Sequence, residues 1–354
     1  MANRHVTLTV YTAAHFAVDL GCGWLVMALL AMRGQQPMQF GGEVVLLYNF
    51  LAFGMQFVFG WLTDAARERG RMWHQYVAFV GCLGVLAALI AGVRTPWLSV
   101  TLVGLGNAAF HVGGGIDSLL FARGKMGRGG IFVSSGAVGV TLGMLLGGTL
   151  YGMLYIPAVL VGACAVAIWL FGKCREESVV MPSQGGQESP LSVGACGLLL
   201  CLFAVLVRSW AGFLFSMPWK QGFWLVLLAA VASAVGKAAG GVLADCFGAR
   251  TVGTVSLLAS VPLVILGGDS VVLSVIGIIC FNMAMPITLH TAAARLPRWE
   301  GFGFGLTTLA LLIGYVAVNC ISIGGIAADI AVAVTGVLAA GAVFLSSAGR
   351  RARK

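Results

Sequence analysis

The chain has 354 residues, of which 59% are hydrophobic and only 9% are charged, and its mean hydropathy is +0.98. Soluble domains contain about 25% charged residues, so this composition excludes a water-soluble globule. Lipid must surround most of the chain, and in lipid the backbone polar groups find partners only within helices or closed barrels.

Apolar runs recur along the chain at the length of a helix that crosses a membrane, about 20 residues. Strands of outer-membrane barrels alternate in segments of about ten residues, so helices fit better. The first run contains His15 and Asp19 and lacks a small-residue cleavage site, so we expect it to be retained. Breaking the chain at polar clusters predicts an all-α membrane protein with twelve transmembrane helices, at residues 6–32, 42–63, 74–93, 97–122, 131–153, 155–172, 191–216, 221–244, 251–267, 270–293, 302–324 and 327–348.

The basic residues predict the orientation of these helices. Most of the 21 Lys and Arg residues lie at the two ends and in alternate loops, whereas the remaining loops hold only Arg33, Arg94 and Lys220. Because basic loops stay in the cytoplasm, both termini are expected there. The membrane is expected to be a cell's inner membrane. The net charge of +9 is then a topology signal, and no nucleic-acid partner is expected.

Cofactor sites are not apparent. The nine cysteines are scattered through apolar runs without a CxxC pair, which predicts neither a metal site nor a disulfide framework. The stretch ASAVGKAAGG contains Gly-Lys but lacks the upstream glycine and the Ser/Thr of a phosphate-binding loop. We therefore expect no cofactor and no use of ATP.

A polar stretch divides the chain into two groups of six segments. It reads KCREESVVMPSQGGQESP and is typical of a flexible linker. The expected domains are a six-helix bundle at 1–173, a cytoplasmic linker at 174–190 and a second six-helix bundle at 191–354.

Two loops repeat each other across this division. GWLTDAARERGR begins at Gly60 and GGVLADCFGAR begins at Gly240; alignment pairs Gly60 with Gly241 and Asp64 with Asp245. A weaker echo relates residues 130–143 to 301–314, each opening the fifth segment of its group. Parallel repeats of this kind predict two pseudo-symmetric bundles related by an axis along the membrane normal, with a substrate site between them.

These loops resemble the signature loop of the major facilitator superfamily, although the first copy has a longer spacing before RGR. The resemblance covers essentially the whole chain and implies that the loop residues lock the two halves together on the cytoplasmic face. Each aspartate can accept hydrogen bonds from N–H groups at a helix start; the alternative is that the aspartates merely end helices. The expected gating residues are Asp64, Arg67, Arg71, Asp245 and Arg250, with Asp117 added from its position near the cytoplasmic end of its segment.

Two further resemblances concern the fourth and fifth segments. Gly130, Gly139, Gly143, Gly147 and Gly148 match the glycines of the superfamily's antiporter motif, with Met144 where the motif has proline. That similarity implies export, whereas close helix packing explains the same glycines. GNAAFHVGGGIDS is loosely similar to the FHP stretch of the fosmidomycin-resistance transporters, but it lacks the proline and the glutamate, so no substrate is inferred from it.

Ionisable residues within the segments are candidates for function, because charges in lipid are costly. His15 and Asp19 share one helix face at i,i+4 spacing, and Asn107 and His111 repeat that spacing. We expect His15, Asp19 and His111 to carry the coupling proton. The alternative is a static hydrogen-bonded pair.

Arg208 is the best candidate for binding an anionic group, since it stays charged and offers a forked donor. We expect it to pair with Asp19 in the empty carrier and to exchange that partner for substrate. Lys237 is expected to snorkel toward the cytoplasm, and Pro286 is expected to break its helix. The remaining substrate-binding candidates are Asn49, Gln56, Asn107, His111, Asn282, Thr307 and Tyr315.

Together these features predict a monomeric secondary active transporter, not an enzyme. It would move a small organic, anionic solute by alternating access, coupled to a proton or cation gradient, with export favoured by the glycines and symport by the Asp19–Arg208 exchange. The alternatives are a membrane-embedded enzyme and a non-transporting receptor or scaffold. The expected partners are the small-molecule substrate, the coupling ion and the lipid bilayer.

Overall fold

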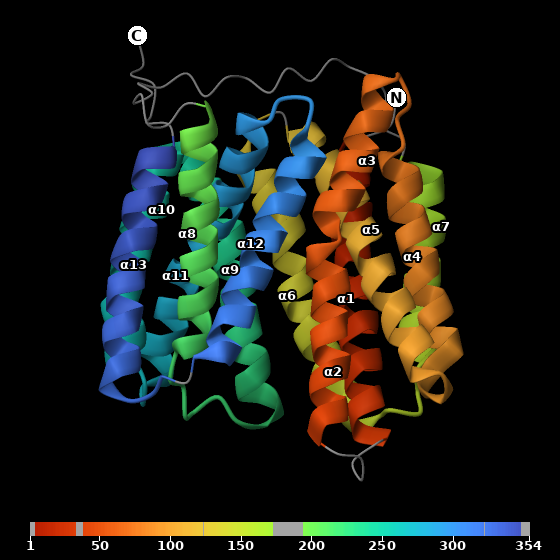
Figure 1. Ribbon diagram of the computed structural model, residues 1–354, viewed down its shortest axis with the longest axis horizontal. Helices are drawn as coiled ribbons and strands as arrows, with labels where there is room; N and C mark the ends of the chain where they lie inside the picture. The colour runs from red at the N-terminus through yellow and green to blue at the C-terminus, as the bar shows by residue number, and fades with distance from the viewer. Residues whose placement is uncertain (1–3, 33–37, 123, 173–193, 322, 348–354) are drawn as a thin grey trace.

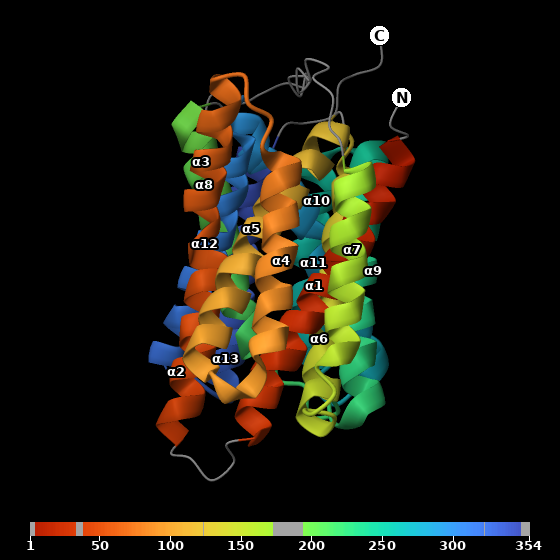
Figure 2. The same ribbon diagram turned by 90° about the vertical axis from the view of Figure 1, so that its right-hand side faces the viewer.

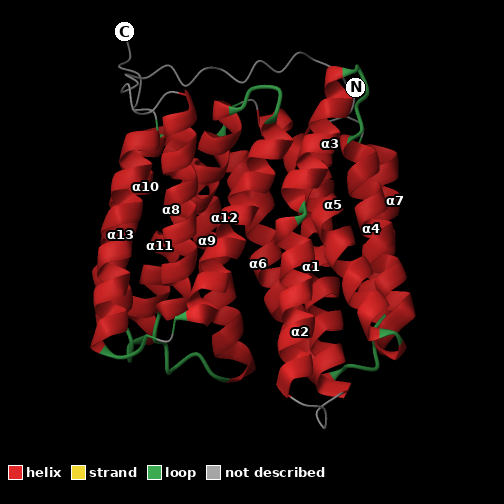
Figure 3. Cartoon of the chain, viewed as in Figure 1, coloured by secondary structure: helices red, strands yellow, loops and turns green. Residues whose placement is uncertain are grey.

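The computed structural model describes residues 4–32, 38–122, 124–172, 194–321 and 323–347. The expected linker at 174–190 lies outside the described residues. Within them the chain is helical and contains no strand (Figure 3). This confirms the all-α prediction.

Each of the twelve expected segments coincides with a helical span. Ten of the spans found among the described residues are long and apolar enough to cross a membrane, and α7 is a shorter apolar helix. The chain is therefore a multi-pass membrane protein. The elements are α1 (Arg4–Met32), α2 (Met38–Asn49), η1 (Phe50–Gly54), α3 (Gln56–Glu68), α4 (His74–Ala91), η2 (Gly92–Arg94), α5 (Pro96–Ala122), α6 (Met126–Thr149), α7 (Tyr155–Phe171), α8 (Gly194–Leu214), α9 (Gly222–Phe247), α10 (Ala249–Leu266), α11 (Val271–Arg295), α12 (Glu300–Cys320) and α13 (Ile326–Ser346).

Two spans differ in detail from the sequence prediction. α11 continues through Pro286 from residue 271 to residue 295, so the expected break is absent. Packing of α11 against α8, α9, α10 and α12 holds the helix together although the proline removes one of its hydrogen bonds. The irregular span is instead the second one, where the π-helical turn η1 separates α2 from α3. Such turns occur frequently at functional sites.

The helices of the first half of the chain lie together, and so do those of the second half (Figures 1 and 2). In the first set α1 packs against α6 and α7, and α4 packs against α5; in the second set α9 and α10 pack against α11, and α8 packs against α13. Contact between the sets runs mainly through α6 against α9 and through α3 against α12. These two interfaces therefore hold the two sets of helices together.

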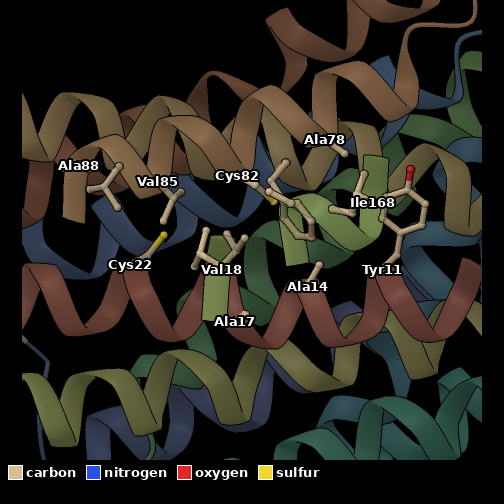
Figure 4. Packing of buried hydrophobic residues seen from close by; sticks show 14 of the residues in the cluster. Tyr11, Ala14, Ala17, Val18, Cys22, Ala78, Cys82, Val85, Ala88 and Ile168 are labelled. Atoms are coloured by element: carbon tan, nitrogen blue, oxygen red, sulfur yellow. The ribbon is translucent and has the colours of Figure 1, made fainter. Parts of the chain in front are cut away.

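Small side chains bring the helices of the first set close together. Figure 4 shows Ala14 and Val18 of α1 on the side that faces Ala78 and Val85 of α4, and all four are buried. On another face of α1, a Cβ atom on Gly139, Gly143 or Gly147 of α6 would collide with backbone atoms of α1. Close packing therefore explains three of the glycines that resemble the antiporter motif.

Adding one methyl group should distinguish packing glycines from unconstrained ones. A Cβ at Gly143 would lie only 2.9 Å from the backbone nitrogen of Trp24, whereas a Cβ at Gly148 would meet only the flexible end of Met27, at 3.7 Å. We expect Gly143→Ala to destabilise the protein by about 1–3 kcal/mol because the backbone must shift. Gly148→Ala should be neutral or slightly stabilising, since alanine favours helix. Thermal unfolding in detergent compares the two variants; equal stabilities would contradict the packing role.

Candidate functional site: a cavity closed at one end

A cavity of about 190 Å³ lies between the two sets of helices. It is smaller than the roughly 300–1,000 Å³ typical of sites for drug-sized ligands, which favours a small solute. Both sets contribute to its walls. The lining residues are His15, Asp19, Phe53, Gln56, His111, Val133, Gly136, Ala137, Val140, Val205, Arg208, Lys237, Met285, Thr288, Leu289, Phe304, Thr307, Thr308 and Leu311.

The first set contributes a compact cluster of ionisable side chains. His15 Nε2 lies 3.2 Å from Asp19 Oδ2, and His111 Nε2 lies 3.5 Å from Asp19 Oδ1. The two imidazoles meet at 2.9 Å between their Nε2 atoms. Asn107 donates its amide N–H to Asp19 Oδ1 at 3.1 Å, and Gly136 leaves the space in which Asp19 and His15 lie. The structure thus brings together all three residues predicted to carry the coupling proton.

The second set contributes two cations. Arg208 is only 5% exposed, and its Nη1 donates a long hydrogen bond of 3.4 Å to the carbonyl oxygen of Phe281. Its guanidinium also lies over the Phe281 ring at 5.4 Å from the centroid, while its Nε has no hydrogen-bond partner among the described residues. Lys237 lines the same cavity. A buried guanidinium without a carboxylate is costly, and an anion in the cavity would compensate it.

The expected pair between Asp19 and Arg208 does not form in this structure. Asp19 instead interacts with His15, His111 and Asn107, all from its own set of helices. Three partners already surround the carboxylate, so it needs no cation from across the cavity. Lys237 also departs from the prediction, because it lies at the cavity wall.

The uncharged candidates divide into two groups. Gln56 and Thr307 line the cavity as predicted, and Asn107 lies behind Asp19. Asn49 and Asn282 instead donate to carbonyl oxygens of their own helices, and Tyr315 packs against Phe213 with ring centroids 5.2 Å apart. These three side chains do not line the cavity. Sequence spacing missed the cavity-lining residues Phe53 and Met285, since apolar residues are the majority in every span.

The two signature aspartates link the two sets of helices beyond one end of the cavity, where α3 ends and α12 begins, and we call this the closed end. Asp64 Oδ2 accepts a hydrogen bond of 2.8 Å from the N–H of Phe302, at the start of α12. Asp245 accepts bonds of 2.7 and 3.0 Å from the N–H groups of Met126 and Gly127, at the start of α6. Each aspartate therefore joins its own set of helices to the other set.

The paired glycines of the same loops permit these contacts. A Cβ atom on Gly60 would overlap the backbone of Gly301, and a Cβ atom on Gly241 would overlap the backbone of Met126. The aligned residues thus occupy equivalent places, each against the first turn of a fifth helix. The reading in which the aspartates only end helices does not account for these contacts across the two sets.

Two ion pairs reinforce the closed end. Arg67 pairs with Glu300, which is 3% exposed, and Arg298 Nε lies 2.7 Å from Glu68 Oε1 at the surface. Arg67 was predicted to act here, whereas Glu300 was missed. Its signal in the sequence was a carboxylate in the short loop RWEG that opens the eleventh span, on the same side as the basic loops.

Among the described residues, three predicted gating residues form no hydrogen bond or ion pair with the opposite set. Asp117 is buried inside the first set, where it accepts a hydrogen bond of 2.6 Å from Tyr11 and lies 3.2 Å from His74 Nδ1. Arg71 is exposed and lies 5.9 Å from the Trp73 ring centroid, and Arg250 donates to the Ser347 carbonyl oxygen at 3.0 Å. The sequence indicated how far along its helix each residue lies, but not the direction in which its side chain points.

The fold of this chain is similar to that of solved transporters of the major facilitator superfamily. The sequence matches no protein-family model and no curated protein. Solved structures show the likeness in the fold.

The human organic anion transporter MFSD10 (TETRAN) is 16% identical, with a TM-score of 0.67, over 98% of this chain and 100% of that one. The fucose:proton symporter FucP of E. coli is 10% identical, with a TM-score of 0.66, over 95% and 97%. FucP in the outward conformation gives 11% identity and a TM-score of 0.65, with coverage of 95% and 97%. The looser similarity to the fosmidomycin-resistance transporters stays a prediction.

Proposed function

We propose that this protein is a secondary active transporter that moves a small organic anion across the inner membrane by alternating access, coupled to a proton. The observation that carries the proposal is the polarised cavity. A His–Asp cluster forms one wall, and Arg208 and Lys237 lie across from it without carboxylate partners among the described residues. At the identities found, the neighbouring structures support the fold alone, so the substrate class rests on these side chains.

Alternating access would move residues 1–173 against residues 191–354 as two pseudo-symmetric six-helix bundles. The contacts of Asp64 and Asp245 support this motion, because hydrogen bonds to helix starts can break and re-form without disturbing either bundle. The concentration of basic residues in the loops at the closed end supports a cytoplasmic location for that end and for both termini. In this state the cavity would exchange its solute at the opposite face.

The glycines of α6 provided the argument for export. Packing against α1 now explains Gly139, Gly143 and Gly147, so the proposal assigns no direction from them. The direction of solute flux relative to an imposed proton gradient distinguishes symport from antiport. The carrier would act as a monomer in the bilayer, without nucleic acid or cofactor.

The test begins with ligand stabilisation, because a solute that binds the native state raises its apparent stability. Purified protein is heated with panels of monocarboxylates, dicarboxylates, phosphate esters and neutral sugars of similar size. We expect stabilisation only by anions, and the stabilising anion should then move across proteoliposome membranes when a pH gradient is imposed. Stabilisation by sugars alone, or an anion flux indifferent to the pH gradient, would contradict the proposal.

A further inference from the structure

We propose that His15 and His111 share a single proton between their Nε2 atoms and that this imidazole pair, not the carboxylate of Asp19, is the coupling-proton site. The idea of coupling rests on the proposed function, whereas the shared proton rests on geometry alone. Asp19 then stays ionised and balances the charge of the pair.

The argument starts from the other nitrogen of each ring. His15 Nδ1 lies 2.8 Å from the carbonyl oxygen of Phe132, and His111 Nδ1 lies 2.9 Å from the carbonyl oxygen of Asn107. A carbonyl oxygen only accepts hydrogen bonds, so both Nδ1 atoms carry the proton that they donate. A neutral imidazole has one N–H, and therefore both Nε2 atoms of neutral rings would present lone pairs.

Those two Nε2 atoms are 2.9 Å apart, a hydrogen-bond distance. Two lone pairs at this separation repel each other, whereas one added proton converts the contact into an N–H···N bond. One ring is then an imidazolium and the other an acceptor. Donor and acceptor counting thus requires one proton for the pair in this state.

The same atoms with Asp19 have the composition of a metal site, since the three ligand atoms lie within 4.8 Å of one another. The spacing favours the proton. Two imidazole nitrogens at about 2.0–2.1 Å from a tetrahedral zinc lie roughly 3.3 Å apart. At 2.9 Å the nitrogens are too close for comfortable ligation and well placed for a hydrogen bond.

The surroundings fit one positive charge balanced by one negative charge. Asp19 lies 3.2 Å from His15 Nε2 and 3.5 Å from His111 Nε2, and Asn107 donates to its Oδ1. Residues 129–149 of α6, which pack against α1, contain no titratable side chain. The other titratable or cationic groups on elements around the pair are Cys22 of α1, Tyr48 of α2, Lys237 of α9 and Arg208 of α8.

Loss of the proton would have a mechanical result. Both lone pairs would then face each other, so the rings would have to separate and the contact between α1 and α5 would change. Proton binding and helix position are therefore linked by repulsion between two nitrogens. An anion that reaches Arg208 adds negative charge to the same cavity and favours retention of the proton.

The direct test is nuclear magnetic resonance of the full chain in lipid nanodiscs with ¹⁵N-labelled histidine. We expect a scalar coupling across the N–H···N bond that links the Nε2 atoms of His15 and His111. His15→Gln and His111→Gln should each abolish it, and the matched control His290→Gln, a buried histidine in the second set, should leave it unchanged. Two independent Nε2 signals without coupling would overturn the shared proton.

Infrared difference spectra across a pH titration then identify the carrier. We expect the imidazole bands to change with pH. We expect no band of a protonated carboxyl group that can be assigned to Asp19 by its loss in Asp19→Asn. Appearance of that band would assign the proton to Asp19. Stoichiometric metal in the purified protein that is lost in His15→Gln would also overturn the assignment. None of these measurements needs a substrate, so failure of the transport assay leaves them interpretable.

Discussion

Replacing Asp64 by asparagine is expected to loosen the closed end of the protein. Asp64 is fully buried, and its Oδ2 accepts the N–H of Phe302 at the positive end of α12. Asparagine keeps the size of the side chain but loses the negative charge, and its NH₂ group would be buried where Asp64 Oδ1 has no hydrogen-bond partner. Both effects weaken the closed state.

Hydrogen bonds to charged groups contribute about 1.5–3 kcal/mol, so the closed end should open roughly 10- to 100-fold more often. Hydrogen exchange measures this opening at the first turns of α12 and α6. Exchange should accelerate in both turns in Asp64→Asn, since one motion separates both contacts. Asp245→Asn should act in the same direction but less strongly, because Asp245 is exposed and screened by solvent.

Glu68→Gln is the matched control. Its pair with Arg298 also joins the two sets of helices, but it lies at the surface, where ion pairs contribute about 0–1 kcal/mol. Exchange at the closed end should therefore change little. Acceleration confined to the α12 turn in Asp64→Asn would identify Asp64 as a local helix cap and would remove it from the gate.

The contacts of Asp64 and Asp245 could be predicted from the sequence because the motif occurs twice. One aspartate after an apolar run is weak information, but Asp64 and Asp245 at equivalent positions predicted a shared role, and both accept backbone N–H groups of the opposite set. The pattern did not extend to their neighbours. Arg71 and Arg250 share the motif with Arg67, yet within the described part of the chain only Arg67 reaches a carboxylate of the other set.

The cluster of His15, Asp19 and His111 could be predicted only in part. The i,i+4 spacing predicted that His15 lies beside Asp19 and that Asn107 lies beside His111, because residues four apart in one helix share a face. That the two pairs meet each other depends on how α1 packs against α5, which no local pattern determines. The same limit explains why Asp19 was paired with Arg208, and why the turn η1 went unnoticed.

Arg208→Met should make the ligand-free protein more stable while abolishing its stabilisation by anions. The guanidinium is almost fully buried, and its described compensation is one long hydrogen bond and the face of Phe281. Burial of an ion costs several kcal/mol, and an unbranched apolar side chain of similar length avoids that cost. We expect a gain of about 1–4 kcal/mol, the range seen when buried ion pairs are replaced by apolar residues.

The same substitution is expected to weaken anion binding. Removing one partner of a buried charge pair costs about 2–5 kcal/mol, so an anion that stabilises the wild type should bind roughly 30-fold to several thousand-fold more weakly. Arg208→Lys separates charge from geometry: it retains the cation but loses the forked donor, so it should bind anions with intermediate affinity. Lys237→Met tests whether the second cation of the cavity contributes. Thermal unfolding with and without the anion measures all three variants. If Arg208→Met is less stable than the wild type when empty and still responds to anions, Arg208 holds helices together and the anion site lies elsewhere.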